Sequence, residues 1–286
     1  MFKQLILCGL LISVNEMSLA STQCSVLWNQ AKERYVNNKE TTEWLYKEWV
    51  GHKTTCQGTG GYELNMASIL YNMGKSKDAV AVLENVLIAY EGPLVFELRL
   101  AHFDYTIMAP AEMSQNVSRE EWLKILAQLK QIHAHYGNDT PFALSRYYSK
   151  LAGIYFHLGK YDKAYHFSKK SVNYYASEYA FVSLIKSAAI LGKYRESIYV
   201  MNEGVKRYKG LFERVDVLMF ASRAAVKIDD MQGATIMMTK ILHLNRELIG
   251  DDFFQETFSG LKEIANKKAK TKEYIRLEGL MDQSGV

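Results

Sequence analysis

The side chains that could support catalysis or bind a metal are few, and their spacing suits neither task. His133 and His135 are two residues apart, which places them on different faces of a helix. Glu120 and Glu121 are adjacent, but a helix cap explains Glu121 without acid–base chemistry. The sequence has no phosphate-binding glycine loop and no nucleophile elbow. It therefore predicts a protein that is not an enzyme and that needs no cofactor or metal.

The first 20 residues have the features of an export signal. Lys3 supplies a positive start, residues 4–14 are apolar, and Ser18-Leu19-Ala20 precedes a cleavage point at Ser21. The apolar stretch is shorter than the roughly 20 residues that a membrane span needs. We therefore expect an exported protein with residues 1–20 as its signal peptide and no stable membrane span. A buried amino-terminal helix is the alternative.

Cleavage of the signal would leave Cys24 and Cys56 as the two cysteines of the chain. An even pair in an oxidising compartment favours a disulfide. It would close a loop of roughly 30 residues and contribute about 3–4 kcal/mol in the chain-entropy model. Two unpaired cysteines are the alternative.

The charge balance is mildly basic, with a net charge of +4 and with Lys and Arg spread along the chain. A nucleic-acid-binding protein would normally cluster its cations into a stripe. The sequence therefore predicts no nucleic-acid partner.

A short phrase recurs along the chain. It reads YNMGKSKDAVAVLENVL at 71–87, FHLGKYDKAYHFSKKSV at 156–172 and AILGKYRESIYVMNEGV at 189–205. Each copy consists of a helical run, then Gly-Lys, then a polar turn and a second helical run. Gly159 and Gly192 are 33 residues apart. A period of this size is typical of a solenoid of stacked helical hairpins.

The residues around these glycines share one frame. In one unit the frame is set by Tyr148, Leu151, Ala152, Tyr155, Gly159, Tyr161, Ala164 and Ser168, and in the next by Phe181, Leu184, Ile185, Ala188, Gly192, Tyr194, Ser197 and Met201. This frame resembles the tetratricopeptide repeat (TPR). The resemblance implies an all-α fold, a right-handed α-solenoid of antiparallel helical hairpins. Two outer units depart from it, because Ser76 replaces the turn aromatic and Asp229 replaces the turn glycine.

The repeats and the local capping signals divide the chain into segments. We expect a signal peptide at 1–20, an amino-terminal capping hairpin with the disulfide at 21–60, a TPR-like repeat at 61–90, an irregular helical repeat with an inserted loop near 109–117 at 91–142, three TPR-like repeats at 143–250, and carboxy-terminal capping helices at 251–286. Ser118 and Glu121 predict a capping box for a helix that runs from Arg119 to about Tyr136. Thr140 and Pro141 predict the start of the next helix.

The resemblance also implies that the first helix of each hairpin lines a concave groove. The groove positions carried over from the frame are Asn65, Ser68, Tyr71, Asn72, Arg146, Ser149, Phe156, Tyr179, Val182, Lys186, Met219 and Arg223. Lys186 and Arg223 occupy the same place in successive repeats, and Arg146 lies in the same row. Such cations would hold an acidic or carboxylate-ended peptide, with Phe156, Tyr179 and Met219 as apolar anchors. A solvated face is the alternative.

The sequence therefore predicts a non-enzymatic, exported TPR adaptor or assembly factor, periplasmic or secreted, that binds a protein or peptide. One alternative is a structural subunit of a cell-envelope or secretion complex that docks through residues 28–49 or 91–142. Another is a small-ligand-binding protein or enzyme with a pocket near His133 and His135 or in the tyrosine-rich stretch at 147–179. The sequence does not set the oligomeric state.

Overall fold

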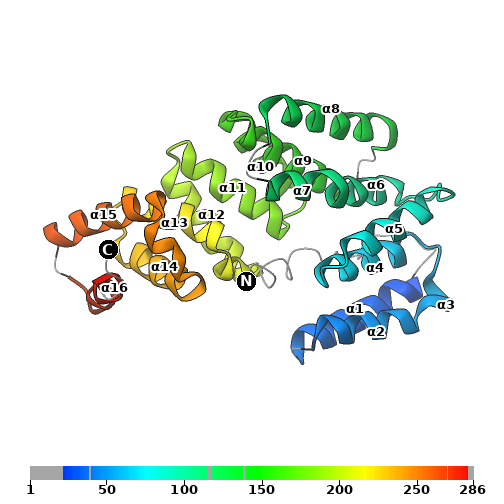
Figure 1. Cartoon of the computed structure of the whole chain (residues 1–286), viewed down its shortest axis with the longest axis horizontal. Coiled ribbons are helices and arrows are strands. Elements are labelled where there is room, and N and C mark those ends of the chain that lie inside the picture. Colours follow the sequence, from blue (N-terminus) through cyan, green and yellow to red (C-terminus); the bar gives the residue numbers. More distant parts are fainter. Residues whose placement is uncertain (1–21, 39, 115–116, 138–139, 269, 283–286) are drawn as a thin grey trace. The chain divides into compact units, whose positions relative to one another are not determined.

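The computed structural model describes residues 22–38, 40–114, 117–137, 140–268 and 270–282, and within these ranges every regular element is helical (Figure 1). The α-helices are α1 (Thr22–Asn37), α2 (Thr42–Gly51), α3 (Lys53–Cys56), α4 (Gly61–Asn72), α5 (Ser76–Leu87), α6 (Val95–Phe103), α7 (Ala109–Met113), α8 (Arg119–Tyr136), α9 (Pro141–His157), α10 (Tyr161–Tyr174), α11 (Glu178–Ile190), α12 (Tyr194–Arg207), α13 (Val215–Lys227), α14 (Met231–Leu244), α15 (Asp252–Lys267) and α16 (Lys272–Asp282). The predicted all-α class and its antiparallel hairpins are confirmed. The predicted signal peptide lies outside the described residues.

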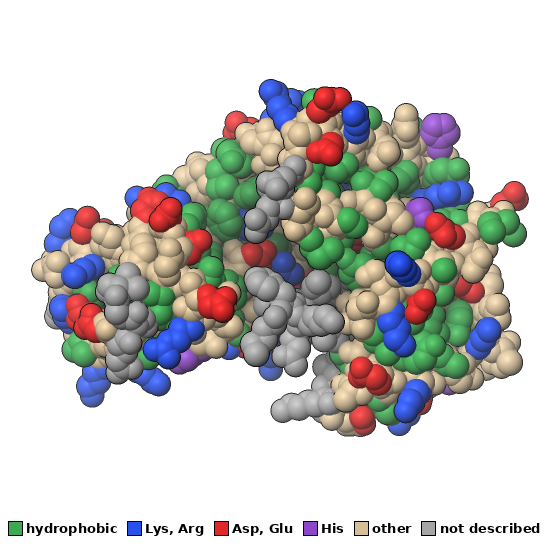
Figure 2. Space-filling model, in the orientation of Figure 1, with side chains coloured by type: hydrophobic (Ala, Val, Ile, Leu, Met, Phe, Trp, Pro, Cys, Tyr) green, Lys and Arg blue, Asp and Glu red, His purple; other side chains and the backbone are tan. Residues whose placement is uncertain are grey.

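Three short elements complete the described chain. They are the π-helix η2 (Asp104–Met108) and the 3-10 helices η3 (Lys209–Glu213) and η4 (Arg246–Gly250). Tertiary contacts group the residues into two compact units, 1–147 and 148–286, and the division falls inside α9. Hydrophobic side chains remain visible between the charged ones on the surface of both units (Figure 2).

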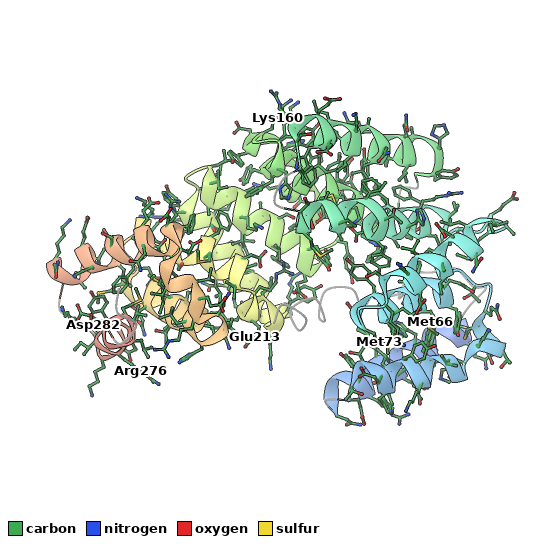
Figure 3. The ribbon with its side chains drawn as sticks, viewed as in Figure 1. Met66, Met73, Lys160, Glu213, Arg276 and Asp282 are labelled. Carbon is green, nitrogen blue, oxygen red and sulfur yellow. A yellow bond between two sulfur atoms is a disulfide. The ribbon has the colours of Figure 1, made fainter. Side chains whose placement is uncertain are left out.

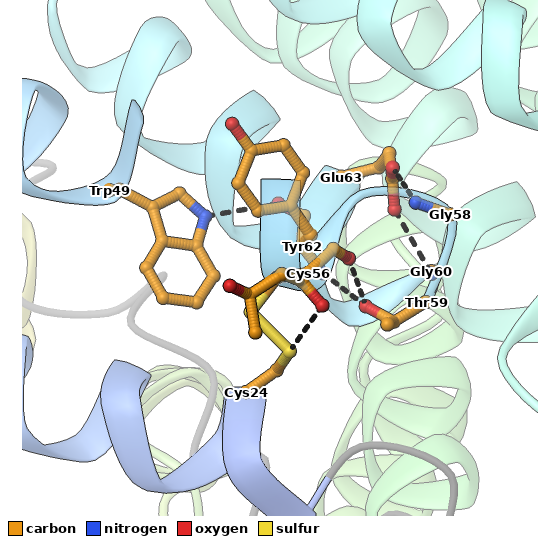
Figure 4. The surroundings of a disulfide bond; sticks show 9 residues. Cys24, Trp49, Cys56, Gly58, Thr59, Gly60, Tyr62 and Glu63 are labelled. Atoms are coloured by element: carbon orange, nitrogen blue, oxygen red, sulfur yellow. Dashed lines mark hydrogen bonds between the residues drawn. A yellow bond between two sulfur atoms is a disulfide. The ribbon is translucent and has the colours of Figure 1, made fainter. Parts of the chain in front are cut away.

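The first hairpin of unit 1 is tied to α3 by a disulfide. Cys24 near the start of α1 is joined to Cys56, with 5.6 Å between their Cα atoms (Figure 4). Beside it the ring centroids of Trp28 and Trp49 lie 4.9 Å apart, and Trp49 Nε1 donates a hydrogen bond to the main-chain oxygen of Tyr62 at 3.2 Å. Because both tryptophans are only 1% exposed, α1 packs as a cover over an aromatic core.

The loop between Cys56 and α4 is held by one carboxylate. Glu63 accepts hydrogen bonds from the main-chain N–H groups of Gly58 at 2.6 Å and Gly60 at 3.0 Å (Figure 4). The two glycines have φ values of 83° and 75°, in the left-handed region that glycine enters without steric cost. Glu63 thereby satisfies the free N–H groups at the start of α4, which fixes the direction of that helix.

The capping signals between residues 117 and 143 are confirmed. Ser118 Oγ accepts from the main-chain N–H of Glu121 at 3.2 Å, and the Glu121 carboxylate accepts from the Ser118 N–H at 2.7 Å. Thr140 Oγ1 accepts from the N–H of Ala143 at 3.3 Å, and Pro141 begins α9.

The loop expected near 109–117 is wrong for its first half. Residues 104–108 form the π-helix η2, and α7 follows directly with Pro110 in its first turn. Proline is tolerated there because the first N–H groups of a helix have no intrahelical partner. Up to Met113 the interruption is therefore a change of helical type rather than a loop.

Unit 2 consists of regular hairpins around a continuous core. Aromatic and aliphatic side chains from α11 to α16 form one buried cluster that includes Phe181, Leu218, Met238, Phe254 and Leu277. The first helices α11, α13 and α15 pack in sequence, and α11 and α13 also pack against α12 and α14, the second helices of their hairpins. A core made of such neighbour contacts leaves one row of first-helix side chains on an open face.

The hairpin turns show why glycine recurs at one position. Gly74, Gly159 and Gly192 all have φ near 70°, and Asp229 takes the same conformation at φ 59°. The left-handed region costs a non-glycine residue roughly 1–2 kcal/mol. Asp229 therefore adopts, with steric strain, the turn conformation that glycine adopts in the other hairpins.

Candidate functional site

The candidate site in unit 2 is built around Lys186. This side chain projects from α11, and its ammonium lies 5.3 Å from the centroid of Phe156 and 5.6 Å from that of Phe220. It also donates a hydrogen bond to Asp216 Oδ2 at 3.4 Å. The cation is thus held between two rings and a carboxylate, a geometry that fixes both its position and its charge.

Arg223 repeats this arrangement one hairpin further on. Its guanidinium lies 4.7 Å from the centroid of Phe253, and Nη2 donates to Glu256 Oε1 at 2.7 Å. In both cases the acid belongs to the next first helix in the chain. The two cations predicted to bind an acidic partner are therefore already paired within unit 2.

The rings beneath these cations form a row along the first helices. Phe156 lies 6.0 Å from Phe220, and Phe220 lies 5.4 Å from Phe253, in edge-to-face contacts. All three side chains are half-buried, so each keeps part of its surface open. We call Phe156, Phe220 and Phe253 the ring row. Such rings are the kind of anchor that dominates protein interfaces.

A partly buried ion network adjoins the ring row. Arg214 donates to Asp216 through Nε at 3.2 Å and Nη2 at 3.1 Å. Burial disfavours ionisation of Asp216, but Arg214 and Lys186 outweigh it and hold the pKa of Asp216 below its ordinary value. The charge of Asp216 therefore persists at neutral pH.

Glu178 is the poorly satisfied member of this network. It is 5% exposed, and its Oε2 atom has no hydrogen-bond partner among the described residues. Burial raises the pKa of Glu178; Arg214 opposes that rise, and Asp216 adds to it. Burial also lowers the pKa of His157, and the charge of Lys186 lowers it further. These shifts arise from packing and from neighbouring charges.

The remaining predicted residues of unit 2 have mixed positions. Ser149, Tyr179 and Met219 are half-buried, and Met219 packs against the unit 2 core. Val182 is only 7% exposed and belongs to that core, so its predicted place on an open surface is wrong. The reason is that α13 packs directly against α11 and covers this position.

Two of the five predicted groove residues of unit 1 are interior. Asn65 and Ser68 are 2% and 1% exposed, so they are not open surface positions. Ser68 hydrogen-bonds to Tyr105 of η2, and Tyr71 stacks on Tyr105 with 4.3 Å between centroids. The π-helix brings Tyr105 against α4 and thereby covers this face, and burial raises the pKa of the Tyr105 hydroxyl.

Two further predicted residues of unit 1 stay half-buried. Asn72 and Arg146 each keep one buried polar atom, Oδ1 and Nη1, without a hydrogen-bond partner among the described residues. Asn65 Oδ1 shares this condition. Arg146 lies in unit 1, whereas Lys186 and Arg223 lie in unit 2.

Sequence reasoning missed four members of the site: Asp216, Phe220, Phe253 and Glu256. A signal for the acids was present, because Asp216 follows Lys186 by 30 residues and Glu256 follows Arg223 by 33. A cation and an acid about one repeat apart on first helices are placed to meet. The rings had a weaker signal, since aromatic residues also fill the core.

Metal and membrane features can be stated only for the described part of the chain. No group of three His, Cys, Asp or Glu side chains in it is arranged to hold a metal ion. His133 instead stacks on Tyr147, with 4.1 Å between centroids. None of the helices in those ranges has an apolar run that would reach across a bilayer.

Comparisons with known proteins bear on the fold. No protein-family model matches the chain, and no curated protein sequence matches it. The crystal structure of the APC/C hetero-tetramer Cut9–Hcn1 is similar, with a TM-score of 0.53 at 10% identity over 85% of this chain and 46% of that chain. The present chain thus spans about half the length of that relative. The TPR2AB-domain:pHSP90 complex of yeast Sti1 has a TM-score of 0.35 at 10% identity, over 83% of this chain and 96% of that chain. The fold is TPR-like.

Proposed function

We propose that this chain is an exported, non-enzymatic TPR-like scaffold that binds a protein or peptide on the ring row of unit 2. The observation that carries the proposal is the row itself. Phe156, Phe220 and Phe253 are half-buried and in edge-to-face contact, and the cations of Lys186 and Arg223 lie over them. Pre-positioned rings lose little conformational entropy on binding, which favours them as contact points.

The Lys186–Asp216 and Arg223–Glu256 ion pairs restrict how an acidic partner could bind. An acidic or carboxylate-ended partner would have to compete with Asp216 for Lys186 and with Glu256 for Arg223. Most of the binding free energy would then come from apolar contact with the rings, and a carboxylate would add selectivity. Met219 and Tyr179 extend the apolar surface beside the row.

Two further observations support the parts of the proposal that concern export and role. The amino-terminal residues have the features of a signal peptide, and the Cys24–Cys56 disulfide suits a periplasmic or secreted protein. The similar structure Cut9–Hcn1 is a hetero-tetramer, which supports a role in holding other proteins by analogy of fold alone.

The test is a capture experiment in the protein's own host. Cells expressing the tagged full chain are crosslinked, and the bound proteins are identified by mass spectrometry. The variant Phe220→Ala/Phe253→Ala removes two rings. The control variant Ile236→Ala/Ile275→Ala removes two exposed apolar side chains of unit 2 that lie outside the row. Circular dichroism verifies that both variants fold.

A partner held by the wild type and the control but lost from the ring variant is the expected result. The Lys186→Glu/Arg223→Glu variant should then weaken capture further if the partner presents a carboxylate. A partner retained by the ring variant would overturn the proposal. It would instead favour a structural subunit that docks through residues 28–49 or 91–142.

A further inference from the structure

Two second helices of unit 2 concentrate the positive charge of the chain. Residues 160–174 and 193–207, which contain α10 and α12, hold eight Lys or Arg residues against three Asp or Glu residues, a net of +5. The whole chain has a net charge of +4, so all other residues together sum to −1. The positive charge is therefore concentrated in these two segments. This differs from the initial expectation that Lys and Arg are spread along the chain. We call these two segments the basic face; Lys160, at its start, is labelled in Figure 3.

Tyr165 joins the two helices of the basic face. Its hydroxyl on α10 donates to Glu196 Oε2 on α12 at 2.6 Å. The ammonium of Lys193 lies 4.2 Å from the centroid of the same ring, and that of Lys169 lies 5.4 Å from it. Cations from both segments are thus placed around one tyrosine, which joins the two segments at this point.

A stack of nearly parallel rings holds further lysines. The ring centroids of Tyr155 and Phe167 are 5.4 Å apart, those of Phe167 and Tyr148 are 5.8 Å apart, and those of Tyr148 and Tyr174 are 5.5 Å apart. Lys163 lies over Tyr155, and Lys170 lies over Tyr148 and Phe167. Ammonium groups that lie over ring faces are held in place by the rings, which arranges the charges before any ligand arrives.

Exposed tyrosines lie among these cations. Tyr199 on α12 is 65% exposed, in a stripe with the exposed Arg195 and Lys206. Tyr174 at the end of α10 is 43% exposed. Tyrosine beside lysine and arginine is typical of surfaces that meet the headgroup region of a bilayer, where an apolar ring and a polar hydroxyl are both accommodated.

We propose that the basic face of α10 and α12 is a peripheral contact surface for the phosphate headgroups of an anionic phospholipid membrane. A single-stranded nucleic acid fits less well, because its bases need open ring faces. In the Tyr155–Phe167–Tyr148–Tyr174 stack the rings cover one another, and lysines lie over three of them. The exposed side chains between these cations are the amphipathic Tyr174 and Tyr199, which suit the headgroup region of a bilayer.

The experiment is cosedimentation of the chain, as purified from its own host, with phospholipid vesicles. One set contains equal parts of phosphatidylglycerol and phosphatidylcholine, and the other contains phosphatidylcholine alone. The face variant is Lys163→Gln/Arg195→Gln/Lys206→Gln. The control variant, Lys47→Gln/Lys77→Gln/Lys262→Gln, removes the same net charge at exposed positions elsewhere.

The wild type should bind the anionic vesicles and release them as salt is added. Each cation near an anionic surface is worth about fivefold in binding, so the face variant should lose about 100-fold. The control variant should lose less than about tenfold. Equal losses in both variants, no binding to anionic vesicles, or binding to a single-stranded oligothymidylate in preference to vesicles would overturn the proposal. The Phe220→Ala/Phe253→Ala variant should keep vesicle binding, which separates this surface from the ring row.

Discussion

At the scale of single residues, the hairpin turns show that two residue types adopt the same backbone conformation. Three turns use glycine at φ near 70°, and the fourth uses Asp229 at φ 59°. Glycine reaches this region freely, but it also loses more backbone entropy on folding. The steric strain at Asp229 and the backbone entropy that a glycine would lose on folding therefore act in opposite directions. Their net effect is measurable as a change in the free energy of unfolding.

Asp229→Gly should raise the free energy of unfolding by about 0.5 kcal/mol, the steric gain less the entropic loss. Lys268 donates to the main-chain oxygen of Asp229, so that hydrogen bond survives the change. Gly192→Ala, at the equivalent turn, is the matched control and should lose about 1 kcal/mol. Urea denaturation measures both. A destabilised Asp229→Gly protein would show that the aspartate side chain contributes more than its strain costs.

Glu178 predicts a dependence of stability on pH. Because burial raises its folded-state pKa above the ordinary value of 4.5, its contribution is fully present below about pH 4.5 and is lost as the pH rises through the raised value. Glu178→Gln removes this pH-dependent loss of stability, because the glutamine side chain does not ionise. The variant should therefore gain stability relative to the wild type between about pH 4 and pH 7, as measured by urea denaturation at both values.

Asp216 provides the contrasting case. Its folded-state pKa is lowered from 3.8, so its contribution is present above that value and is lost as the pH falls through the lowered one. Asp216→Asn should therefore lose more stability at neutral pH than in acid. If Glu178→Gln and Asp216→Asn changed with pH in the same direction, the assigned ion network would be wrong.

Sequence reasoning was accurate where a residue acts on its chain neighbours. Ser118 and Glu121 cap α8 as predicted because both partners lie within one turn. It failed where another helix decides the outcome. Asn65 and Ser68 belong to a face that η2 covers. No local pattern around Asp104 indicates a π-helix. Lys186 was placed on the correct helix, but its pairing with Asp216 depends on how two repeats stack.

At the scale of elements, α1 depends strongly on its covalent link. Its buried side chains among the described residues are Cys24, Trp28 and Ala31, a narrow apolar stripe for a helix of 16 residues. A terminal hairpin also has a neighbour on one side only. The disulfide therefore compensates for limited packing.

Cys24→Ser/Cys56→Ser should lower the free energy of unfolding by about 3–4 kcal/mol, the entropic value for a loop with a sequence separation of 32. Release of α1 should also expose Trp28 and Trp49 and shift their fluorescence to longer wavelength. Chemical denaturation followed by tryptophan emission reports both effects, and reduction of the wild type is the control. An unchanged midpoint in the double variant would mean that packing alone holds the hairpin.

At the scale of the whole molecule, a chain of stacked hairpins should respond to damage locally. Each hairpin contacts its neighbours and little else, so stability is nearly a sum of unit and interface terms. In unit 2, α16 packs against α14, and Leu277 is fully buried there.

Leu277→Ala should cost about 2–5 kcal/mol at this end of unit 2. Amide hydrogen exchange should accelerate in α14, α15 and α16, while α4 and α5 of unit 1 keep the protection that they have in the wild type. Uniform loss of protection along the chain would show a single cooperative transition. Leu123→Ala, at a 44% exposed position on α8, is the control and should leave the pattern unchanged.

Four of the side-chain ties between successive hairpins of unit 2 have similar lengths. They join residues that are 31 apart for Tyr165 and Glu196, 30 for Lys186 and Asp216, 32 for Tyr208 and Ala176, and 33 for Arg223 and Glu256. Duplication of one complete hairpin would recreate every tie in the new copy. Insertion of one residue within a helix would instead rotate each later side chain by about 100° and separate the partners. The length of this chain can therefore grow only in steps of one hairpin.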